Sequence, residues 1–266
     1  MRKISLQEQR IIELGIMDDI HSFCVQHDLR YSMAGGTLLG AVRHRGFIPW
    51  DDDIDIIMPR SDYETLIQSY RSDKNELHEL RNDGSCVELF LKVSRKGTRL
   101  VDKTLGRQQW GISIDIFPID GSREDCEEEA ARIKQMREKL ARICPYYKSA
   151  EKKYRLIWFL KYCIKRLIYF YPHSVRYLKH KIDAFAYNKD LTGGERAGVK
   201  IGGHGIREMI DSKVFLSTTL MDFEDRQYFG LTDFEPFLKS HYGDFMQLPP
   251  EEKRVLPHYY DAYIEE

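Results

Sequence analysis

Four aspartates gather immediately before an apolar stretch in the N-terminal part of the chain. They are Asp51, Asp52, Asp53 and Asp55, and residues 56–58 are Ile-Ile-Met. Side chains alternate between the two faces of a strand, so a strand over residues 53–58 would project Asp53 and Asp55 from one face while Ile54, Ile56 and Met58 enter the core. Carboxylates held side by side repel each other unless they share a proton or bind a cation, and oxygen-only ligands favour Mg²⁺, Mn²⁺ or Ca²⁺ over zinc. The pattern therefore indicates a divalent-metal site.

Two other interpretations apply to the same acidic run. A cluster of acids is most often a solvated loop, and the run alone leaves that interpretation open. Asp51, Asp53 and Asp55 also match the first three ligand positions of a calcium-binding loop. That loop requires glycine at its sixth position, where this chain has Ile56, so the sequence excludes it.

A glycine pair upstream supports the metal interpretation. Gly35, Gly36 and Thr37 end a short apolar stretch and open residues 37–44, whose pattern is typical of a helix. Glycines let backbone N–H groups approach a phosphate closely, and a helix N-terminus adds a partial positive charge. A glycine pair alone more often marks only a turn. Together with the aspartates it predicts a phosphate-binding turn that faces a metal site, and hence metal-assisted phosphoryl chemistry.

Three further side chains lie between these two motifs. Arg43 and Arg45 carry guanidinium groups, whose geometry matches phosphate oxygens, so we expect at least one of them to bind a donor phosphate. Surface solvation fits either arginine nearly as well. Trp50 adjoins the acids, where it either packs beneath the site or stacks on a nucleotide base.

Two aspartates further along the chain, Asp115 and Asp244, are also candidate site residues and are interpreted separately. Asp115 lies between two isoleucines of a predicted strand over residues 111–117. It is either a third carboxylate of the metal site or an edge residue that caps a turn. In the first case it binds a second metal or accepts the proton of the attacking hydroxyl, and the sequence leaves both roles open. Asp244 follows Gly243 and is interpreted as an ordinary turn residue.

The elements that must position these residues follow from hydrophobic periodicity. Helices are predicted over residues 6–28, 37–44, 61–70 and 124–143, and strands over residues 30–34, 53–58, 87–93, 99–103 and 111–117. This order predicts an α+β fold in which helices flank a small mixed sheet. The length of 266 residues suits a single domain, with a core over about residues 25–120 and 195–258 and a helical insertion over about residues 122–190.

Composition narrows the class of partner and compartment. The formal net charge of −1 gives no overall bias toward nucleic acid, and none is expected as a partner. The five cysteines form no Cys-x-x-Cys pair, which favours a reducing compartment. No apolar signal core begins the chain and no run is long enough to cross a bilayer, so we expect a cytoplasmic protein.

A basic and aromatic segment over residues 154–170 is the second informative region. Its apolar residues share one half of a helical wheel, while its basic residues share the other half with aromatic ones. Between residues 148 and 181 ten basic residues accompany one acidic residue, Glu151. The segment therefore either packs on the protein's own core or lies peripherally on the anionic inner face of a membrane.

Three stretches of this sequence resemble one known family. Residues 34–55, AGGTLLGAVRHRGFIPWDDDID, look like the LicD family, which also includes the fukutin-related transferases. Residues 114–120, 242–246 and 248–250 fit the same family, so the resemblance spans about residues 25–258. The glycine pair with the later Asp-x-Asp also resembles the signature of the nucleotidyltransferase superfamily of the polymerase-beta type.

The resemblance implies a fold, an activity and a site. The fold is the polymerase-beta-like nucleotidyltransferase fold. The activity is transfer of a phospho-alcohol, first of all phosphocholine, from a CDP-linked donor to a cell-surface glycan or its lipid-linked precursor, such as lipopolysaccharide, capsule or teichoic acid, with release of CMP. The site residues are Asp53, Asp55 and Asp115 for catalysis and for binding Mg²⁺, or Mn²⁺ in its place, and Gly35, Gly36, Thr37, Arg43 and Arg45 for the donor phosphates. Two alternatives stay open: a nucleotidyltransferase that moves NMP from NTP to a small molecule, and a non-catalytic nucleotide-binding scaffold.

Overall fold

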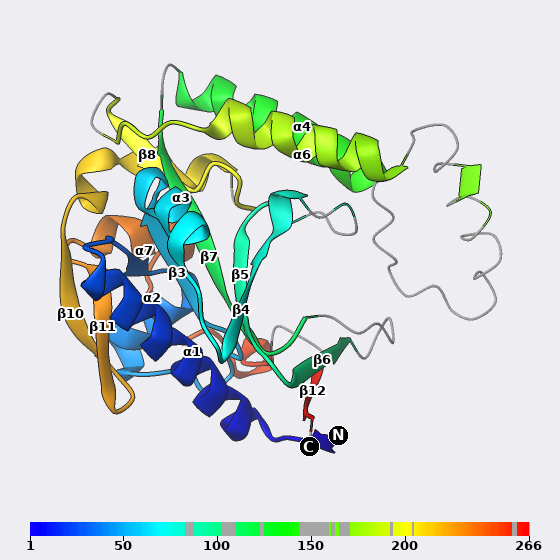
Figure 1. Ribbon diagram of the computed structural model, residues 1–266. Coiled ribbons are helices and arrows are strands. Elements are labelled where there is room, and N and C mark those ends of the chain that lie inside the picture. Colours follow the sequence, from blue (N-terminus) through cyan, green and yellow to red (C-terminus); the bar gives the residue numbers. More distant parts are fainter. Residues whose placement is uncertain are drawn as a thin grey trace.

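The computed structural model of the protein (Figure 1) describes residues 1–82, 84, 88–102, 110–122, 125–143, 160, 163–164, 171–191, 194–203, 205–256 and 260–265. Over these residues the protein is a mixed α/β structure in which helices pack on a mixed sheet, as the sequence predicted. The division into a core and an insertion stays a prediction.

The central sheet contains the strand that follows the acidic run. Its main path has the order β2 (Ser32–Met33), β3 (Asp55–Pro59), β7 (Ser113–Gly121), β5 (Leu91–Arg95) and β4 (Asn75–Glu79). Two short strands, β8 (Arg196–Gly198) and β9 (Ile210–Asp211), extend it from β7. β3 and β7 are parallel, whereas the other neighbours on this path are antiparallel. The first residues of the parallel pair therefore lie at the same edge of the sheet.

The helices that pack on the central sheet explain why the sequence of β3 is a run of apolar residues. Residues 56–59 are all buried, which is typical of a strand that is covered on both faces. The helix α1 (Leu6–Gln26) packs against β5 and β7, α2 (Gly35–His44) packs against β3, and α3 (Arg60–Ser69) packs against β3 and β7. Ser5 begins α1 with a capping box, in which its hydroxyl accepts from the Glu8 N–H and the Glu8 carboxylate accepts from the Ser5 N–H.

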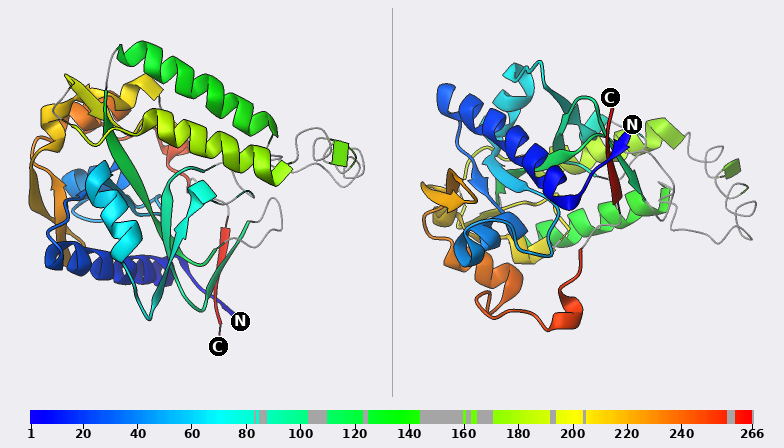
Figure 2. Two further views of the ribbon diagram at one scale, coloured as in Figure 1. Left: turned by 45° about the horizontal axis from the view of Figure 1, so that its top comes forward. Right: turned by 90° about the horizontal axis from the view of Figure 1, so that it is seen from below.

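Two smaller sheets complete the β-structure. β6 (Thr98–Asp102) and β1 (Arg2–Lys3) flank β12 (Tyr260–Ile264), so the two ends of the chain lie side by side, as Figures 1 and 2 show. β10 (Thr218–Phe223) and β11 (Arg226–Leu231) form an antiparallel hairpin beside α2 and β2. The chain then continues through α7 (Glu235–Tyr242), which contacts α2.

The two long helices α4 (Cys126–Ile143) and α6 (Tyr171–Ala186) pack together at the top of Figure 1. Short 3₁₀ turns at Leu80–Asn82, Gly205–Glu208, Ser212–Phe215 and Glu251–Lys253 connect other elements. Most of the basic segment 154–170 lies outside the described residues, so its choice between internal packing and membrane contact stays a prediction. Among the described residues, no helix combines the length and the apolar composition that crossing a bilayer requires.

A buried ionic network fixes α6 to the end of the central sheet. Arg60, which is fully buried at the start of α3, donates to Asp120 at 2.6 Å and to Asp183 of α6 at 2.9 Å. Arg81 also donates to Asp183, at 2.9 Å, and to Glu64 at 2.8 Å. Because buried charges are stable only when paired, this network specifies how α6 docks.

Three of the predicted strands are present, and the start of one needs correction. The strand predicted over residues 53–58 begins only at Asp55, so Asp53 belongs to the loop before β3. The strands predicted over residues 87–93 and 99–103 are present as β5 and β6, and the turn at Gly97 joins them. They nevertheless pair with different partners, β5 with β4 and β7 and β6 with β12, because strand pairing over long sequence distances leaves little local signal.

Candidate active site

The first residue of β3 places a carboxylate at the edge of the sheet. Asp55 pairs in register with Asp115 on the parallel strand β7. The Asp55 N–H donates to Thr37 Oγ1 at 2.8 Å, and the Asp55 carbonyl accepts from the Ala34 N–H at 3.0 Å. These two hydrogen bonds fix the start of β3 to the N-terminus of α2.

Two glycines let the carboxylates approach α2 closely. Gly35 has a φ of +51°, and a Cβ at this position would lie 3.1 Å from Asp55 Oδ2. A Cβ at Gly36 would lie only 2.3 Å from Asp51 Oδ2, so any side chain there would displace the Asp51 carboxylate. The absence of side chains therefore lets two carboxylates lie directly over the N-terminal turn of α2, whose N–H groups favour negative charge.

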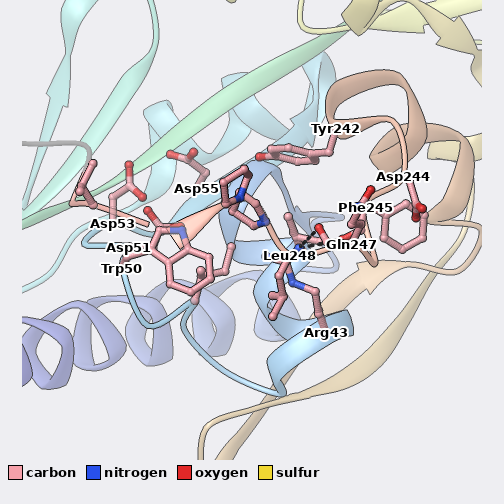
Figure 3. A pocket seen from close by; sticks show the side chains of 16 residues that line it. Arg43, Trp50, Asp51, Asp53, Asp55, Tyr242, Asp244, Phe245, Gln247 and Leu248 are labelled. Atoms are coloured by element: carbon pink, nitrogen blue, oxygen red, sulfur yellow. Dashed lines mark hydrogen bonds between the residues drawn. The ribbon is translucent and has the colours of Figure 1, made fainter. Parts of the chain in front are cut away.

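These groups line an open cavity of about 720 Å³ (Figure 3). Its lining includes four carboxylates and three aromatic side chains, namely those of Asp51, Asp53, Asp55, Asp244, Trp50, Tyr242 and Phe245. Arg43 also contributes to the lining, and its Nη1 donates to the carbonyl of Phe245 at 2.8 Å. The cavity is therefore strongly acidic and large enough for a nucleotide-sized ligand.

A second, smaller cavity of about 70 Å³ lies on the other side of Asp53. Its lining includes Glu13 of α1 together with Asp52, Asp115 and Lys92. Asp53 belongs to the linings of both cavities. The acidic run therefore separates two spaces of different size and shares a carboxylate between them.

Burial and neighbouring negative charges both disfavour the charged form of Asp55. Burial raises the pKa of Asp55 well above its usual range, and the carboxylates of Asp53 and Asp115 raise it further, while Lys92 opposes them. Burial and Asp55 likewise raise the pKa of the Tyr242 phenol. A buried cluster of acids with such neighbours either keeps protons or gains a cation.

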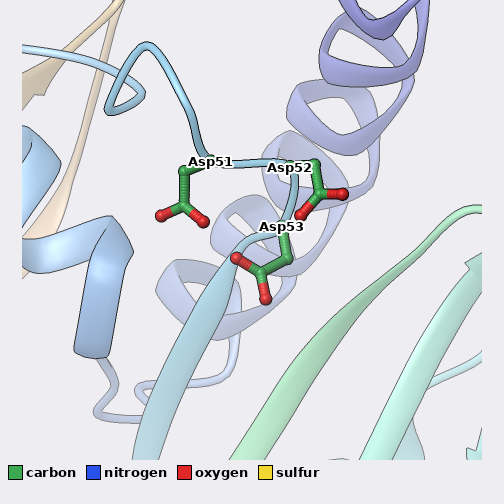
Figure 4. Close-up of side chains that lie close together, drawn as sticks. All are labelled: Asp51, Asp52 and Asp53. Carbon is green, nitrogen blue, oxygen red and sulfur yellow. The ribbon is translucent and has the colours of Figure 1, made fainter. Parts of the chain in front are cut away.

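The donor set fits a divalent cation that prefers oxygen ligands. Asp51, Asp52 and Asp53 each offer a carboxylate oxygen, and these oxygens lie within 4.8 Å of one another (Figure 4). Asp55 and Asp115 are not in this group, which therefore differs from the predicted set of Asp53, Asp55 and Asp115. The sequence-based set remains a prediction about the metal-bound state, since ligand side chains rotate to meet an ion.

Lys92 gives Asp115 a partner within the protein. Lys92 lies opposite Asp115 in the antiparallel register of β5 and β7, and its Nζ forms an ion pair with the Asp115 carboxylate. Although burial lowers the pKa of Lys92, the carboxylates of Asp115 and Asp55 raise it above its usual value. Asp115 therefore faces the smaller cavity with a counter-charge, whereas Asp55 faces the larger one.

Comparisons with known proteins agree with the sequence pattern. Residues 28–139 match the family described as LicD/FKTN/FKRP, nucleotidyltransferase domain. Over 275 aligned positions the chain is 28% identical to the lipopolysaccharide cholinephosphotransferase LicD of Haemophilus influenzae, and the alignment covers 99% of this chain and all of that protein. Residues 28–139 of this chain therefore match a LicD-type nucleotidyltransferase domain, called the LicD domain below.

Two uncharacterized proteins are similar to shorter parts of this chain. One, from Rickettsia typhi, is 29% identical over 100 residues, which cover 34% of this chain and 32% of that protein. The other, from Rickettsia prowazekii, is 47% identical over 57 residues, which cover 21% of each chain. Both proteins are uncharacterized, so these alignments add further similarity but no information on function.

Within the LicD domain, the predicted phosphate-binding residues have different surroundings. Gly35 and Gly36 lie against the carboxylates, and Thr37 is buried and accepts from the Asp55 N–H. Arg43 lines the larger cavity. Arg45 instead forms the exposed C-cap of α2, about 15 Å of helix away from Gly35, and does not line the cavity. Of the two arginines, Arg43 therefore has the better position for a donor phosphate, and the role of Arg45 stays a prediction.

The structure also adds residues to the site of the LicD domain. Asp244, interpreted from its sequence as a turn residue, lines the larger cavity together with Tyr242. Trp50 lines the same cavity, and the Arg254 guanidinium lies over its ring at 5.5 Å from the centroid. Lys92 was missed because its role depends on the pairing of β5 with β7. The available signal was a lysine between two buried residues of a predicted strand.

Proposed function

We propose that this protein is a metal-dependent phosphotransferase that moves phosphocholine from CDP-choline to a cell-surface glycan or its lipid-linked precursor and releases CMP. The observation that carries the proposal is the contact of the Asp51 and Asp55 carboxylates with the glycine turn at the N-terminus of α2. The likeness to the Haemophilus influenzae enzyme supports lipopolysaccharide as the class of acceptor. We also propose that the LicD domain has the polymerase-beta-like fold, because β3 and β7 bring carboxylates to one sheet edge beside that turn.

The donor diphosphate is assigned to the space between α2 and the aspartates. The N–H groups at the start of α2 are the binding site for its oxygens, and Gly35 and Gly36 allow the close approach. Arg43 lies along the same cavity and supplies positive charge for the leaving CMP. A Mg²⁺ or Mn²⁺ ion held by Asp53 and Asp55 would neutralise charge that develops on the diphosphate.

The acceptor hydroxyl attacks the phosphorus atom that carries the choline, and its proton passes to water. The bond from this phosphorus to the bridging oxygen breaks, and CMP leaves with that oxygen. Asp115 is separated from the larger cavity by Asp53 and is paired with Lys92. This position favours Asp115 as a support for the metal ligands over a role as the base that accepts the hydroxyl proton.

The charge of the larger cavity favours choline over neutral alcohols. The lining contains four aspartates, which attract a trimethylammonium group, whereas glycerol and ribitol carry no charge for them to recognise. Trp50 and Tyr242 supply aromatic faces of the kind that bind quaternary ammonium ions. The stacking of the Arg254 guanidinium on Trp50 already places one cation on such a face.

The proposal is tested by incubating the protein with Mg²⁺, choline-free lipopolysaccharide and a panel of donors: CDP-choline, CDP-ethanolamine, CDP-glycerol, CDP-ribitol and the NTPs. We expect CMP release to be fastest from CDP-choline, with phosphocholine recovered on the glycan, and EDTA to stop the reaction. Arg45→Ala is the control that should retain activity. Pyrophosphate release from an NTP would instead identify a nucleotidyltransferase, and binding of CDP-choline without turnover on any glycan would favour a scaffold.

A further inference from the structure

Glu13 is a buried carboxylate that the proposed reaction does not use. It lies on α1 and is only 2% exposed. Its Oε1 accepts from Gln9 Nε2 at 2.9 Å, but its Oε2 is buried without a hydrogen-bond partner. A buried carboxylate oxygen without a hydrogen-bond donor is energetically unfavourable, because burial removes the water that would hydrate it and no protein group donates in its place. Such a group either keeps a proton or binds a cation.

The surroundings of Glu13 are acidic. Gln9 Nε2 also donates to the Asp52 carbonyl at 3.0 Å, so Glu13 Oε1 and that carbonyl oxygen are within about 6 Å of each other. Asp52 is 8% exposed, and its carboxylate oxygen lies within 4.8 Å of one from Asp53. Glu13, Asp52 and Asp53 therefore contribute three carboxylates to the lining of the smaller cavity, and Figure 4 shows the last two beside each other.

The smaller cavity supplies the space that a cation needs. It has a volume of about 70 Å³, enough for an ion and one or two water molecules at roughly 30 Å³ each. Its lining holds the carboxylates of Glu13, Asp52, Asp53 and Asp115. Among the described residues of this lining, Lys92 supplies the positive charge. The nearby Arg10 directs its Nη2 to the backbone carbonyls of residues 48, 49 and 51. Negative charge therefore exceeds positive charge in this cavity.

We propose that Glu13, Asp52 and Asp53 form a second divalent-cation site, distinct from the site at which Asp53 and Asp55 would meet the donor diphosphate. All its ligands are oxygen atoms, which selects Mg²⁺, Mn²⁺ or Ca²⁺. The ion fixes the acidic loop to α1, and through the shared carboxylate of Asp53 it sets the position of that ligand in the larger cavity. The site goes beyond the proposed function, since it requires no donor.

The test counts Mn²⁺ ions bound by the full-length protein without nucleotide, from the decrease of the free-ion electron paramagnetic resonance signal. We expect two ions per chain for the wild type, one for Glu13→Gln and one for Asp55→Asn. Glutamine imitates a protonated glutamate, so Glu13→Gln leaves the count unchanged if Glu13 merely keeps a proton. Glu127→Gln, at an exposed glutamate of α4, is the control that should bind two.

Each result has a defined consequence. A count of two for Glu13→Gln, or a single wild-type ion that Glu13→Gln retains, would overturn the proposal. A single wild-type ion that Glu13→Gln loses and Asp55→Asn retains would support the Glu13 site and contradict the metal site of the proposed function. If Glu13→Gln does not fold, Asp52→Asn is used in its place, with the same expected count of one ion. The number of ions bound by the wild type can be measured whether or not the variants fold.

Discussion

Replacing Gly35 with alanine separates the chemistry of the site from the stability of the fold. Gly35 has a φ of +51°, and Gly97 has a φ of +72°. Alanine in this left-handed region costs roughly 1–2 kcal/mol, so Gly35→Ala and Gly97→Ala should lose similar free energy of unfolding. A Cβ at Gly97 meets no atom within 4 Å, whereas a Cβ at Gly35 lies 3.1 Å from Asp55 Oδ2. The two variants therefore share the backbone strain and differ in the contact with Asp55.

That contact sets the expected effect on the rate. The Asp55 carboxylate must move by a few tenths of an ångström to accept the Gly35→Ala methyl group, while its backbone N–H stays fixed to Thr37 Oγ1. A misplacement of about 1 Å can cost about 100-fold in rate, so the smaller shift should cost about tenfold. CMP release from CDP-choline measures the rate, and urea unfolding measures the stability. Equal rates for Gly35→Ala and Gly97→Ala, at equal losses of stability, would refute the assignment of Asp55 to the reaction.

Three further substitutions test the charges. Asp55→Asn should lower CMP release at least about 1,000-fold, as loss of a charge-stabilising group does. In EDTA the same variant should unfold at a higher temperature than the wild type at pH 8. The raised pKa of Asp55 means that the folded wild type holds a proton that the unfolded chain releases, so wild-type stability falls as pH rises from about 4 through the folded pKa. Lys92→Met leaves the mostly buried Asp115 carboxylate without its ion-pair partner, and chemical unfolding in EDTA should show a loss of about 3 kcal/mol. Asp183→Asn weakens its contacts with Arg60 and Arg81, and urea unfolding should show a loss of about 3 kcal/mol with no change in the Michaelis constant for CDP-choline.

Controls for these substitutions come from the same pairs. The difference between Asp55→Asn and the wild type should shrink at pH 4, and a difference that is constant with pH would exclude the proton as its cause. Adding Asp115→Asn to Lys92→Met should restore part of the stability, because the negative charge that Lys92 compensates is then also removed. A double variant as unstable as Lys92→Met alone would show that the ion pair contributes little. An unchanged unfolding curve for Asp183→Asn would show that the buried ionic network does not determine how α6 docks.

Local patterns were sufficient to predict the elements that carry the glycine turn and the acidic run. The apolar residues of β3 and the glycine pair before α2 are contiguous in the sequence, and both elements are present in the structure. The start of β3 was placed two residues too early, because alternation of side chains does not show where a loop becomes a strand. β12 was not predicted, since its pairing with β1 and β6 joins segments far apart in the chain.

The residues that were missed owe their roles to tertiary structure. Lys92 meets Asp115 only because β5 pairs with β7, and a shift of one residue would turn its side chain to the other face. Tyr242 reaches the larger cavity through the packing of α7 on α2. Glu13 did leave a signal in the sequence. It shares a helix face with the buried Ile16, Met17 and Ile20 at spacings of three, four and seven residues, where an acid is unexpected.

The most direct test of the central claim is the ³¹P nuclear magnetic relaxation of CDP-choline bound to the Mn²⁺-loaded protein. If Asp53 and Asp55 hold a cation against the donor diphosphate beside the glycine turn, bound Mn²⁺ should strongly shorten the relaxation times of both phosphorus atoms, and Asp55→Asn should remove most of this effect. CDP-choline that binds the Mn²⁺-loaded wild type with unaltered phosphorus relaxation would contradict the account.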